Sequence, residues 1–415
     1  MRKQDKPEKL GPPDMWLLGT VLVLVAIGVL LVFDASYKKT VEAPWAGYDT
    51  WFFAKRQLVF AAAGLIAMAV AASMRLKTFL KLATPLLWVS IALLAGVLVF
   101  GVCRNGAHRW YQFGPVSFQP SELAKIALVL FLAGLFARRK SAVRRLNSRW
   151  LAPLCFVGAI AFLVLKEPDL GTTIAIAGTC YVMFIAAGAL KRHILGTGLV
   201  GISIAFAAIY TNHERMERVL TWLDPWRDRY GEGYQIIHSL IAHGTGGWLG
   251  IGLCEGREKA YLPAASTDFV FATVSEEAGL IGGILLIVLF LVVIYRGLDI
   301  ARRAQSTYAG LLAVGATSVV GLQAAINIAV VTSSIPATGV PLPFISYGGS
   351  ALVSMLISVG ILLAVSRQVD AGLEDRDLYE NSFDRWRDGR AHISGDQRRS
   401  SAPRSKARSR TALRG

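Results

Sequence analysis

Residues 15–33 read MWLLGTVLVLVAIGVLLVF, a run of 19 residues that contains no charged side chain. A transmembrane helix needs about 20 predominantly apolar residues to cross roughly 30 Å of hydrocarbon. The run is longer than the roughly 7–15-residue apolar region of a secretory signal peptide, and further runs of the same kind follow it. We therefore expect residues 15–33 to form a first membrane-spanning helix that stays in the protein.

Nine further stretches are apolar enough to cross a membrane, with ends defined to within a few residues. They are residues 57–73, 79–101, 122–137, 150–165, 172–190, 193–210, 269–295, 308–332 and 349–366. The sequence thus predicts an all-α polytopic membrane protein with about ten transmembrane helices.

The composition agrees with a membrane protein. Of the 415 residues, 54% are hydrophobic and only 17% are charged, and the mean hydropathy is +0.48. A soluble domain carries about 25% charged residues. These values exclude an ordinary water-soluble enzyme, a disordered chain and a disulfide-stapled secreted module. The four cysteines form no C-x-x-C pair and no metal-ligand spacing, which predicts free thiols, with a Cys103–Cys254 bridge on an oxidising face as the alternative.

Lysine and arginine are distributed unevenly between the two sets of loops. If the N-terminus is cytoplasmic, the inner segments hold 30 of these residues and the outer loops hold 13. Basic residues favour the cytoplasmic side, so we expect both termini there. The net charge is +16. The chain ends in an Arg-rich tail, residues 368–415, which we expect to be disordered and to bind no nucleic acid. Residues 1–14 form the other tail, and residues 15–367 the membrane domain.

The predicted outer loops differ in length and character. Residues 211–267, between the seventh and eighth spans, form by far the longest, and residues 102–121 carry Arg109. The loop near 333–348 is rich in glycine and proline and has no charge. Backbone of that kind at membrane depth is tolerated only where it is buried in protein or lines a wet cavity.

Ionisable residues inside a span or at its mouth are costly and tend to be functional. Most of those in this chain lie at the outer ends of the spans, and two lie about 12–14 Å deeper on a regular helix. The outer set is Glu122, Lys125, Glu167, Asp169 and Asp268, and the deeper pair is Glu276 and Glu277.

Each of these residues also has a purely structural interpretation. Glu122 follows a Pro-Ser helix start, where the helix dipole favours a carboxylate, and Lys125 is placed to pair with it. Asp169 and Asp268 are candidate helix caps. Arg215 and Arg218, one turn apart, are also typical of a solvated helix face.

The deeper pair has two interpretations. Glu276 and Glu277 are candidate structural partners of Gln323 or Asn327. A polar site at depth is also typical of transporters, so the pair keeps a flippase or transporter for lipid-linked sugars as an alternative function.

The outer loops carry five ordered motifs. They are NGAHRW with QPSELAK (105–110, 119–125), EPDLGT (167–172), RMERVL through LDPW to GYQ (215–220, 223–226, 233–235), YLP with TDFVFA (261–263, 267–272), and PLPFISYGGS (341–350). Together they resemble the SEDS (shape, elongation, division, sporulation) family, the FtsW/RodA peptidoglycan glycosyltransferases. The LDPW and GYQ segments look more like FtsW than RodA.

The sequence departs from the family pattern at two places. The family usually has a Pro-Glu-x-His-Thr-Asp stretch, whereas residues 263–268 read PAASTD, so the glutamate is missing and Ser266 replaces the histidine. Ser275 stands where glycine is usual. A role of the family's histidine therefore does not carry over to Ser266.

The resemblance implies a multi-pass enzyme of the inner (cytoplasmic) membrane that polymerises lipid II on its outer face, in cell division or cell elongation. The expected reaction is a single inverting displacement with undecaprenyl pyrophosphate as the leaving group. The expected partners are lipid II and undecaprenyl-linked glycan, a class B penicillin-binding protein acting as transpeptidase, and other cell-wall or divisome proteins. A non-catalytic scaffold of a cell-wall synthase is a further alternative.

Residue roles follow from the resemblance together with the chemistry. Asp268 is the expected catalytic base, because the attacking hydroxyl must lose a proton. Cations are needed where the pyrophosphate leaves. The expected substrate-binding residues are Arg109, Arg215, Arg218, Lys259, Lys125 and Ser346, the supporting ones are Glu122, Asp169, Gln235 and Glu277, and Glu122 with Asp169 are candidate ligands of a divalent cation, Mg or Mn.

Overall fold

The computed structural model describes residues 11–41, 48–104, 106–114, 116–138, 148–231 and 233–369. The first ten residues and nearly all of the predicted basic tail, residues 370–415, lie outside the described residues. The long helices are α1 (Met15–Val41), α2 (Phe52–Ser73), α3 (Leu76–Phe100), α4 (Pro120–Arg138), α6 (Ser148–Lys166), α7 (Leu170–Ala186), α8 (Lys191–Tyr210), α12 (Gly279–Arg303), α13 (Thr307–Val331) and α14 (Gly349–Val369).

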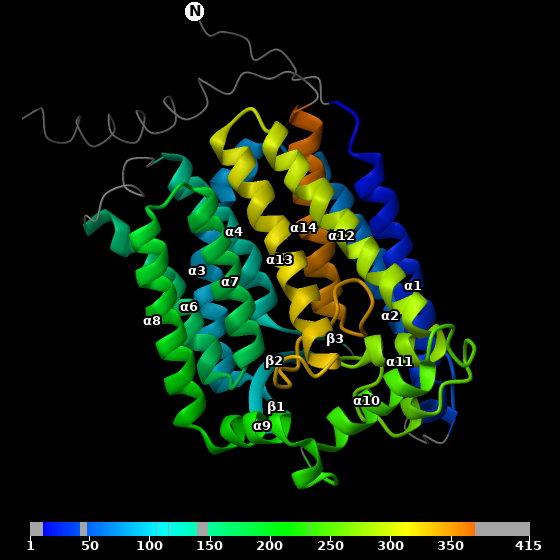
Figure 1. Cartoon of the computed structure of the whole chain (residues 1–415). Helices are drawn as coiled ribbons and strands as arrows, with labels where there is room; N and C mark the ends of the chain where they lie inside the picture. Colours follow the sequence, from blue (N-terminus) through cyan, green and yellow to red (C-terminus); the bar gives the residue numbers. More distant parts are fainter. Residues whose placement is uncertain are drawn as a thin grey trace, which may run out of the picture. The chain divides into compact units, whose positions relative to one another are not determined.

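Shorter elements connect them (Figure 1). The predicted long outer loop folds into α9 (His213–Leu223), α10 (Gly233–Gly246) and the 3-10 turns η2 (Pro225–Asp228) and η3 (Glu258–Ala260), and α11 (Val270–Glu277) leads into α12. Strands β1 (Val102–Arg104), β2 (Ala107–Phe113) and β3 (Val116–Phe118) form an antiparallel sheet in the order β1-β2-β3. Figure 1 shows this sheet with α9, α10 and α11 at one end of the long helices, and the start of α1 and the end of α14 at the other.

The helices confirm the prediction of an all-α polytopic membrane protein. Within the described ranges, eight helices are long and apolar enough to cross a membrane: α1, α2, α3, α4, α8, α12, α13 and α14. The other two predicted spans coincide with α6 and α7, whose apolar segments, Pro153–Lys166 and Leu170–Ala186, are shorter. The cytoplasmic location of both termini stays a prediction.

Helix α13 lies at the centre of the helix packing. It packs against α12, α7, α14 and α4. Of its most apolar 18-residue stretch, 56% is buried inside the protein. Helix α8 is far less buried than α13: only 6% of its most apolar 18-residue stretch is buried, and it contacts mainly α7 and α9. Most side chains of α8 therefore face away from the protein, toward lipid.

Helices α2 and α14 approach each other through small residues. A Cβ atom on Gly64 would lie 2.5 Å from a methyl of Leu356, and one on Gly360 would lie 2.6 Å from the carbonyl oxygen of Met68. Lipid tails are as apolar as leucine, so helices in a membrane associate through close packing of this kind. The two glycines make that approach possible.

The predicted helix 269–295 is wrong as a single element, because it breaks between Glu277 and Gly279. Gly279 has φ +66°, and a Cβ there would lie 2.4 Å from the backbone nitrogen of Gly250. The loop after α10 satisfies carbonyls that the break exposes: the N–H of Ile251 donates to Glu276 at 3.1 Å and that of Gly252 to Glu277 at 3.1 Å. Packing of a distant loop therefore sets the break.

The predicted topology has a direct test with cysteine labelling. In a background where the native cysteines, all free thiols, are replaced by serine, we expect a cysteine at Tyr230 to react with an impermeant reagent in intact cells, because Tyr230 is 81% exposed on the predicted outer loop. A cysteine at exposed Arg302 should react only after permeabilisation. The reverse pattern would contradict the charge-based orientation.

Candidate functional site

Asp268 lies in a turn just before α11 and is half-buried. The N-cap of α11 is Phe269, which makes no side-chain cap hydrogen bond, so the interpretation of Asp268 as the helix cap is wrong. Asn327 on α13 holds the backbone of Asp268 in place. Its side-chain amide donates to the carbonyl of Asp268 at 2.8 Å and to that of Val340 at 2.8 Å. A Cβ on Gly339 (φ +70°) would lie 3.7 Å from Asp268 Oδ2. The Gly339 backbone therefore runs close to this carboxylate.

The Gly- and Pro-rich loop before α14 is fastened to the turn that carries Asp268. The N–H of Tyr347 donates to the carbonyl of Ser266 at 2.8 Å. The Ser346 hydroxyl donates to the carbonyl of Thr267 and accepts from the N–H of Leu342 at 2.8 Å. The structure thus places Ser346 as a buried support of the turn, and its predicted contact with substrate stays a prediction.

Arg109 joins the small sheet to the turn between α6 and α7. Its Nε donates to the carbonyl of Glu167 at 2.7 Å and its Nη2 to that of Pro168 at 2.6 Å. These bonds hold the guanidinium beside Glu167 and Asp169. The cation is therefore fixed in direction before any ligand arrives.

Arg215 and Arg218 lie one turn apart on α9, as their spacing predicts. Asn212 caps α9 by accepting from the N–H of Arg215 at 3.2 Å. The Arg215 guanidinium donates to Ala208 at the end of α8 and to Leu165 at the end of α6, at 3.1 Å each. Desolvation first, and then the charges of Arg218 and Arg109, lower the pKa of Arg215, which places the three cations near one another.

Charged residues of three separate segments act on Asp268. Desolvation is the main reason that the pKa of Asp268 rises to about 6, with Asp169 adding to the rise and Arg109 and Arg218 opposing it. The structure therefore brings together Asp268, Asp169, Arg109 and Arg218, which the sequence separates by up to 159 positions (109 to 268). We call these four residues, with Arg215, the outer charge cluster.

Asp169 caps α7, as its structural interpretation predicts. It accepts from the N–H of Thr172 at 2.9 Å and from the Thr172 hydroxyl at 2.9 Å, and Gln119 donates to it at 3.4 Å. Its charge still acts on Asp268. Capping and membership of the outer charge cluster are thus compatible.

Glu167, two residues earlier, is fully buried. Neither of its carboxylate oxygens has a hydrogen-bond partner among the described residues. Desolvation, with a smaller contribution from Asp169, raises its pKa to about 8, and Arg109 opposes the rise. Glu167 therefore carries a proton at neutral pH, a state that the sequence did not indicate.

Glu122 and Lys125 form the pair that their spacing predicts. The Lys125 ammonium lies 2.9 Å from Glu122 Oε1 and donates to Gln323 at 2.5 Å. Gln323 in turn donates to the carbonyl of Pro341 at 3.1 Å. This buried chain connects α4 and α13 to the loop that supports Asp268. The proposed substrate contact of Lys125 stays a prediction.

Lys259 and Glu277 belong to a second buried cluster, which joins α1 to η3 and α11. The Lys259 ammonium pairs with Asp34 of α1 and with Glu277 at 2.6 Å. Glu277 also accepts from the backbone N–H groups of Cys254 and Gly256, at 3.1 Å each. The structure thus places Lys259 with carboxylates and not with the arginines of α9, and its role toward pyrophosphate stays a prediction.

Gln323 and Asn327 are not the partners of Glu276 and Glu277, so that prediction is wrong. Glu276 accepts from the N–H of Arg257 at 2.7 Å, and Glu277 binds the neighbouring loop. The break before α12 keeps both carboxylates next to this loop instead of deep in a continuous helix. The observation that favoured a transporter is thereby removed.

Gln235 is half-buried on α10, and no observation tests its supporting role. Sequence reasoning missed Asn327 as the support of Asp268 and Asp34 as the partner of Lys259. Both are polar residues within apolar helices, which is the signal that identifies them.

The residues expected to bind a divalent cation do not fit that role as a pair. Glu122 Oε1 is paired with an ammonium, and both oxygens of Asp169 accept hydrogen bonds. Within the described part of the chain, no three His, Cys, Asp or Glu side chains are grouped to hold a metal ion.

The fold and the site define a polytopic membrane protein with a charged site at one end of its helices. The model of a family described as "Cell cycle protein", which takes in FtsW, RodA and SpoVE, matches residues 15–371. The chain belongs to this FtsW/RodA/SpoVE family.

Relatives in sequence cover nearly the whole membrane domain. Stage V sporulation protein E of Bacillus subtilis (strain 168) is 42% identical over 365 residues, which are 86% of this chain and 98% of that protein. A probable peptidoglycan glycosyltransferase FtsW of Geobacter sp. (strain M18) is 38% identical over 359 residues, covering 86% and 97%.

Solved structures share the fold. A chain from a structure described as "Structural coordination of polymerization and crosslinking by a peptidoglycan synthase complex" superposes with a TM-score of 0.70 at 31% identity, covering 87% of this chain and 98% of that chain. The rod shape determining protein RodA of Thermus thermophilus gives a TM-score of 0.63 at 28% identity, covering 86% and 97%.

The raised pKa of Glu167 predicts how stability depends on pH. Between the ordinary carboxyl pKa of 4.5 and about 8, the native state holds a proton that the unfolded chain has lost, so stability decreases as pH rises through this window. In the wild type, the apparent melting temperature should fall between about pH 5.5 and about pH 8. We expect a smaller fall over the same range in Glu167→Gln, which has no carboxyl group to lose a proton. Glu214→Gln on an exposed part of α9 is the control. An unchanged slope in Glu167→Gln would contradict the prediction.

Proposed function

We propose that this protein is a peptidoglycan glycosyltransferase that polymerises lipid II on the outer face of the cytoplasmic membrane. The observation that carries the proposal is Asp268, a half-buried carboxylate with a pKa raised to about 6 and with Arg109 and Arg218 close enough to act on it. Membership of the FtsW/RodA/SpoVE family and the names of relatives such as the Geobacter FtsW support the same reaction class.

Asp268 has the properties of a general base. With a pKa of about 6 it is mostly ionised at neutral pH, yet it is a stronger base than an ordinary aspartate, which suits proton abstraction near its own pKa. In the proposed step the sugar 4-hydroxyl oxygen attacks the anomeric carbon of the donor and its proton passes to Asp268. The bond from that carbon to the pyrophosphate oxygen breaks, and undecaprenyl pyrophosphate leaves with the electron pair.

Arg109 and Arg218 provide positive charge for the departing pyrophosphate. The guanidinium fork matches two phosphate oxygens, and charge fixed in advance stabilises the leaving group without reorganisation. Arg215 contributes to the same field, although its hydrogen bonds to the ends of α6 and α8 also give it a structural task.

The substrate carries a long lipid, so the site must be open to the membrane. Helix α8 faces lipid over most of its length, and its end is tied by Arg215 to the end of α6. A lipid-linked donor entering beside α8 would bring its pyrophosphate to the arginines of α9. This arrangement supports lateral entry of the substrate.

The finer biological assignments rest on the relatives. We propose an FtsW-like role with a class B penicillin-binding protein as the transpeptidase partner, because a structural neighbour is part of a peptidoglycan synthase complex and the Geobacter relatives are named FtsW. A requirement for Mg or Mn stays a proposal without assigned ligands in this chain.

The role of Asp268 predicts both a substitution effect and a pH profile. Asp268→Asn is expected to lower lipid II polymerisation by about 10²–10⁴, because an amide does not accept the proton. In the wild type, the rate should fall about tenfold per pH unit below about pH 6 and level off above it. Purified protein, with and without the transpeptidase, is assayed for glycan length.

Two controls accompany this measurement. Asp228→Asn removes an exposed carboxylate of the same outer loop and should keep full activity. Membrane yield and thermal stability confirm folding of each variant. Near-wild-type synthesis by well-folded Asp268→Asn would exclude this base, and lipid scrambling without glycan would favour a flippase.

The arginine assignment predicts a loss of roughly 10- to 150-fold in turnover for Arg218→Ala, equal to about 1.5–3 kcal/mol for a charge-assisted contact with phosphate. Arg218→Lys should recover only part of it, since lysine lacks the fork. Arg227→Ala, an exposed arginine nearby, is the matched control. Equal activity of Arg218→Ala and Arg227→Ala would return Arg218 to a solvated helix face.

A further inference from the structure

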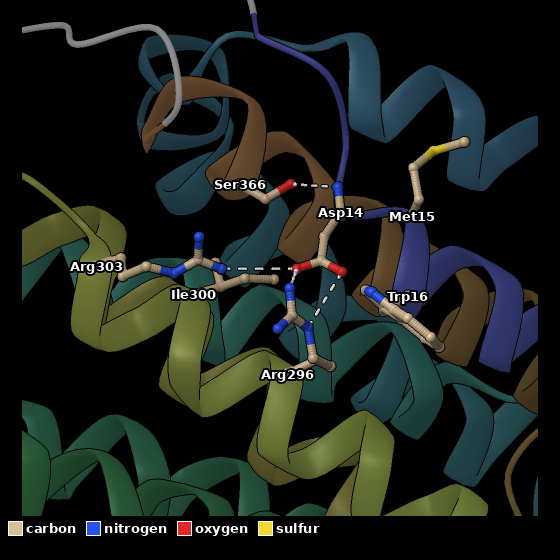
Figure 2. Close-up of a pocket in the computed structure, with 7 residues that line it drawn as sticks. All are labelled: Asp14, Met15, Trp16, Arg296, Ile300, Arg303 and Ser366. Carbon is tan, nitrogen blue, oxygen red and sulfur yellow. Dashed lines mark hydrogen bonds and ion pairs between the residues drawn. The ribbon is translucent and has the colours of Figure 1, made fainter.

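A second polar site lies at the end of the helices opposite to Asp268. A cavity of about 100 Å³ there is lined by residues of α1, α12 and α14, and by Asp14 just before α1. Figure 2 shows Asp14 between Ser366 and the guanidinium groups of Arg296 and Arg303, with Trp16 beside them. None of these residues takes part in the proposed reaction.

Asp14 fixes the walls of this cavity. Its N–H donates to the Ser366 hydroxyl at 3.2 Å, and its carboxylate accepts from Arg296 at 3.3 Å and 2.5 Å. The carboxylate is 3% exposed. The chain just before it is also held, because the N–H of Gly11 donates to the carbonyl of Arg367 at 2.9 Å. The start of α1 is thereby joined to the ends of α12 and α14.

Arg303 is the part of this site that faces outward. Its Nη2 lies 2.9 Å from Asp299 and 3.7 Å from Asp14, and the side chain is 44% exposed. Both contacts use the same end of the guanidinium, which has five N–H donors in all. Among the described residues, no ion pair engages the other end of the Arg303 guanidinium, so its remaining N–H donors can reach a ligand in the cavity.

The charge around the cavity is positive. Two carboxylates, Asp14 and Asp299, form ion pairs with Arg296 and Arg303, and a third arginine, Arg367, donates to the carbonyl of Gly11 nearby. The carboxylates orient two of these cations without neutralising the group. An anion is therefore the ligand that the cavity favours.

The position of the cavity relative to the bilayer identifies the source of that anion. Trp16 opens the first span and is 74% exposed, as is typical of tryptophan at headgroup level. The distribution of basic residues predicts that this end of the helices faces the cytoplasm. Large apolar side chains next to the cavity, Met15 on α1 and Tyr295 on α12, are also exposed and would contact acyl chains.

We propose that this cavity binds the phosphate group of an anionic phospholipid in the cytoplasmic leaflet. Arg303 and the indole N–H of Trp16 donate to the phosphate oxygens, and Arg296, held by Asp14, adds to the field. The volume corresponds to about three water molecules at roughly 30 Å³ each, which admits a phosphate group and leaves the acyl chains outside along α1 and α12. The bound lipid would strengthen the contact between α1 and α12 at this end.

Native mass spectrometry of the purified full-length protein tests the proposal. We expect the first bound phosphatidylglycerol to have at least about tenfold higher affinity than phosphatidylcholine, consistent with a charge-assisted contact. Arg303→Gln should remove this preference, and Arg303→Lys should retain part of it. Arg302→Gln is the matched control, because it removes the same charge from the neighbouring position, which is exposed and does not belong to the cavity wall.

The outcomes separate a built site from general attraction to charge. Equal loss in Arg303→Gln and Arg302→Gln would overturn the proposal, since any basic residue near an anionic membrane attracts lipid. Displacement of the lipid by millimolar inorganic phosphate would overturn the lipid assignment in favour of free phosphate. If Arg303→Gln fails to fold, Arg303→Lys carries the test: a lipid preference equal to that of the wild type would then refute the role of the guanidinium fork.

Discussion

The membrane leaves no water to satisfy backbone polar groups, and this constraint decides where Asp268 sits. Where the chain leaves helical structure near the outer ends, one irregular segment pairs with another. The N–H of Tyr347, in the loop before α14, donates to the carbonyl of Ser266 in the turn before α11, and the Asn327 amide donates to the carbonyls of Asp268 and Val340. The reactive carboxylate is therefore held by bonds that the fold needs in any case.

Buried charges in this protein are of two kinds. Lys125 with Glu122, and Lys259 with Asp34 and Glu277, are ion pairs closed by further hydrogen bonds, and they fasten helices and loops together. The outer charge cluster is different. The charges of Arg109 and Arg218 lower the pKa of Asp268, but desolvation raises it by more. Pairs with completed hydrogen bonds support the structure, whereas a carboxylate whose pKa is raised by desolvation is suited to chemistry.

Helix α1 is anchored at both ends by carboxylates that meet cations from other helices. Asp34 reaches Lys259 at the outer end, and Asp14 reaches Arg296 at the opposite end. Helix α8 differs from α1 in that most of its side chains face lipid and are not buried in the protein. The fold thus combines a fixed group of helices with an element exposed to the membrane, next to the arginines that are proposed to receive a lipid-linked substrate.

The sequence by itself determined the spans and most members of the site, because bilayer thickness sets the length of an apolar run and because an ionisable residue at the end of a span is visible in the sequence. It also identified the Asp169 cap and the Glu122–Lys125 pair, which depend on residues within one helical turn. Only the tertiary structure decided that α11 breaks at Gly279, that Lys259 meets Asp34, and that Asp268 is supported by Asn327 instead of capping a helix. Those features depend on contacts between residues 25 to 225 positions apart. A local sequence pattern does not report the free energy of such contacts.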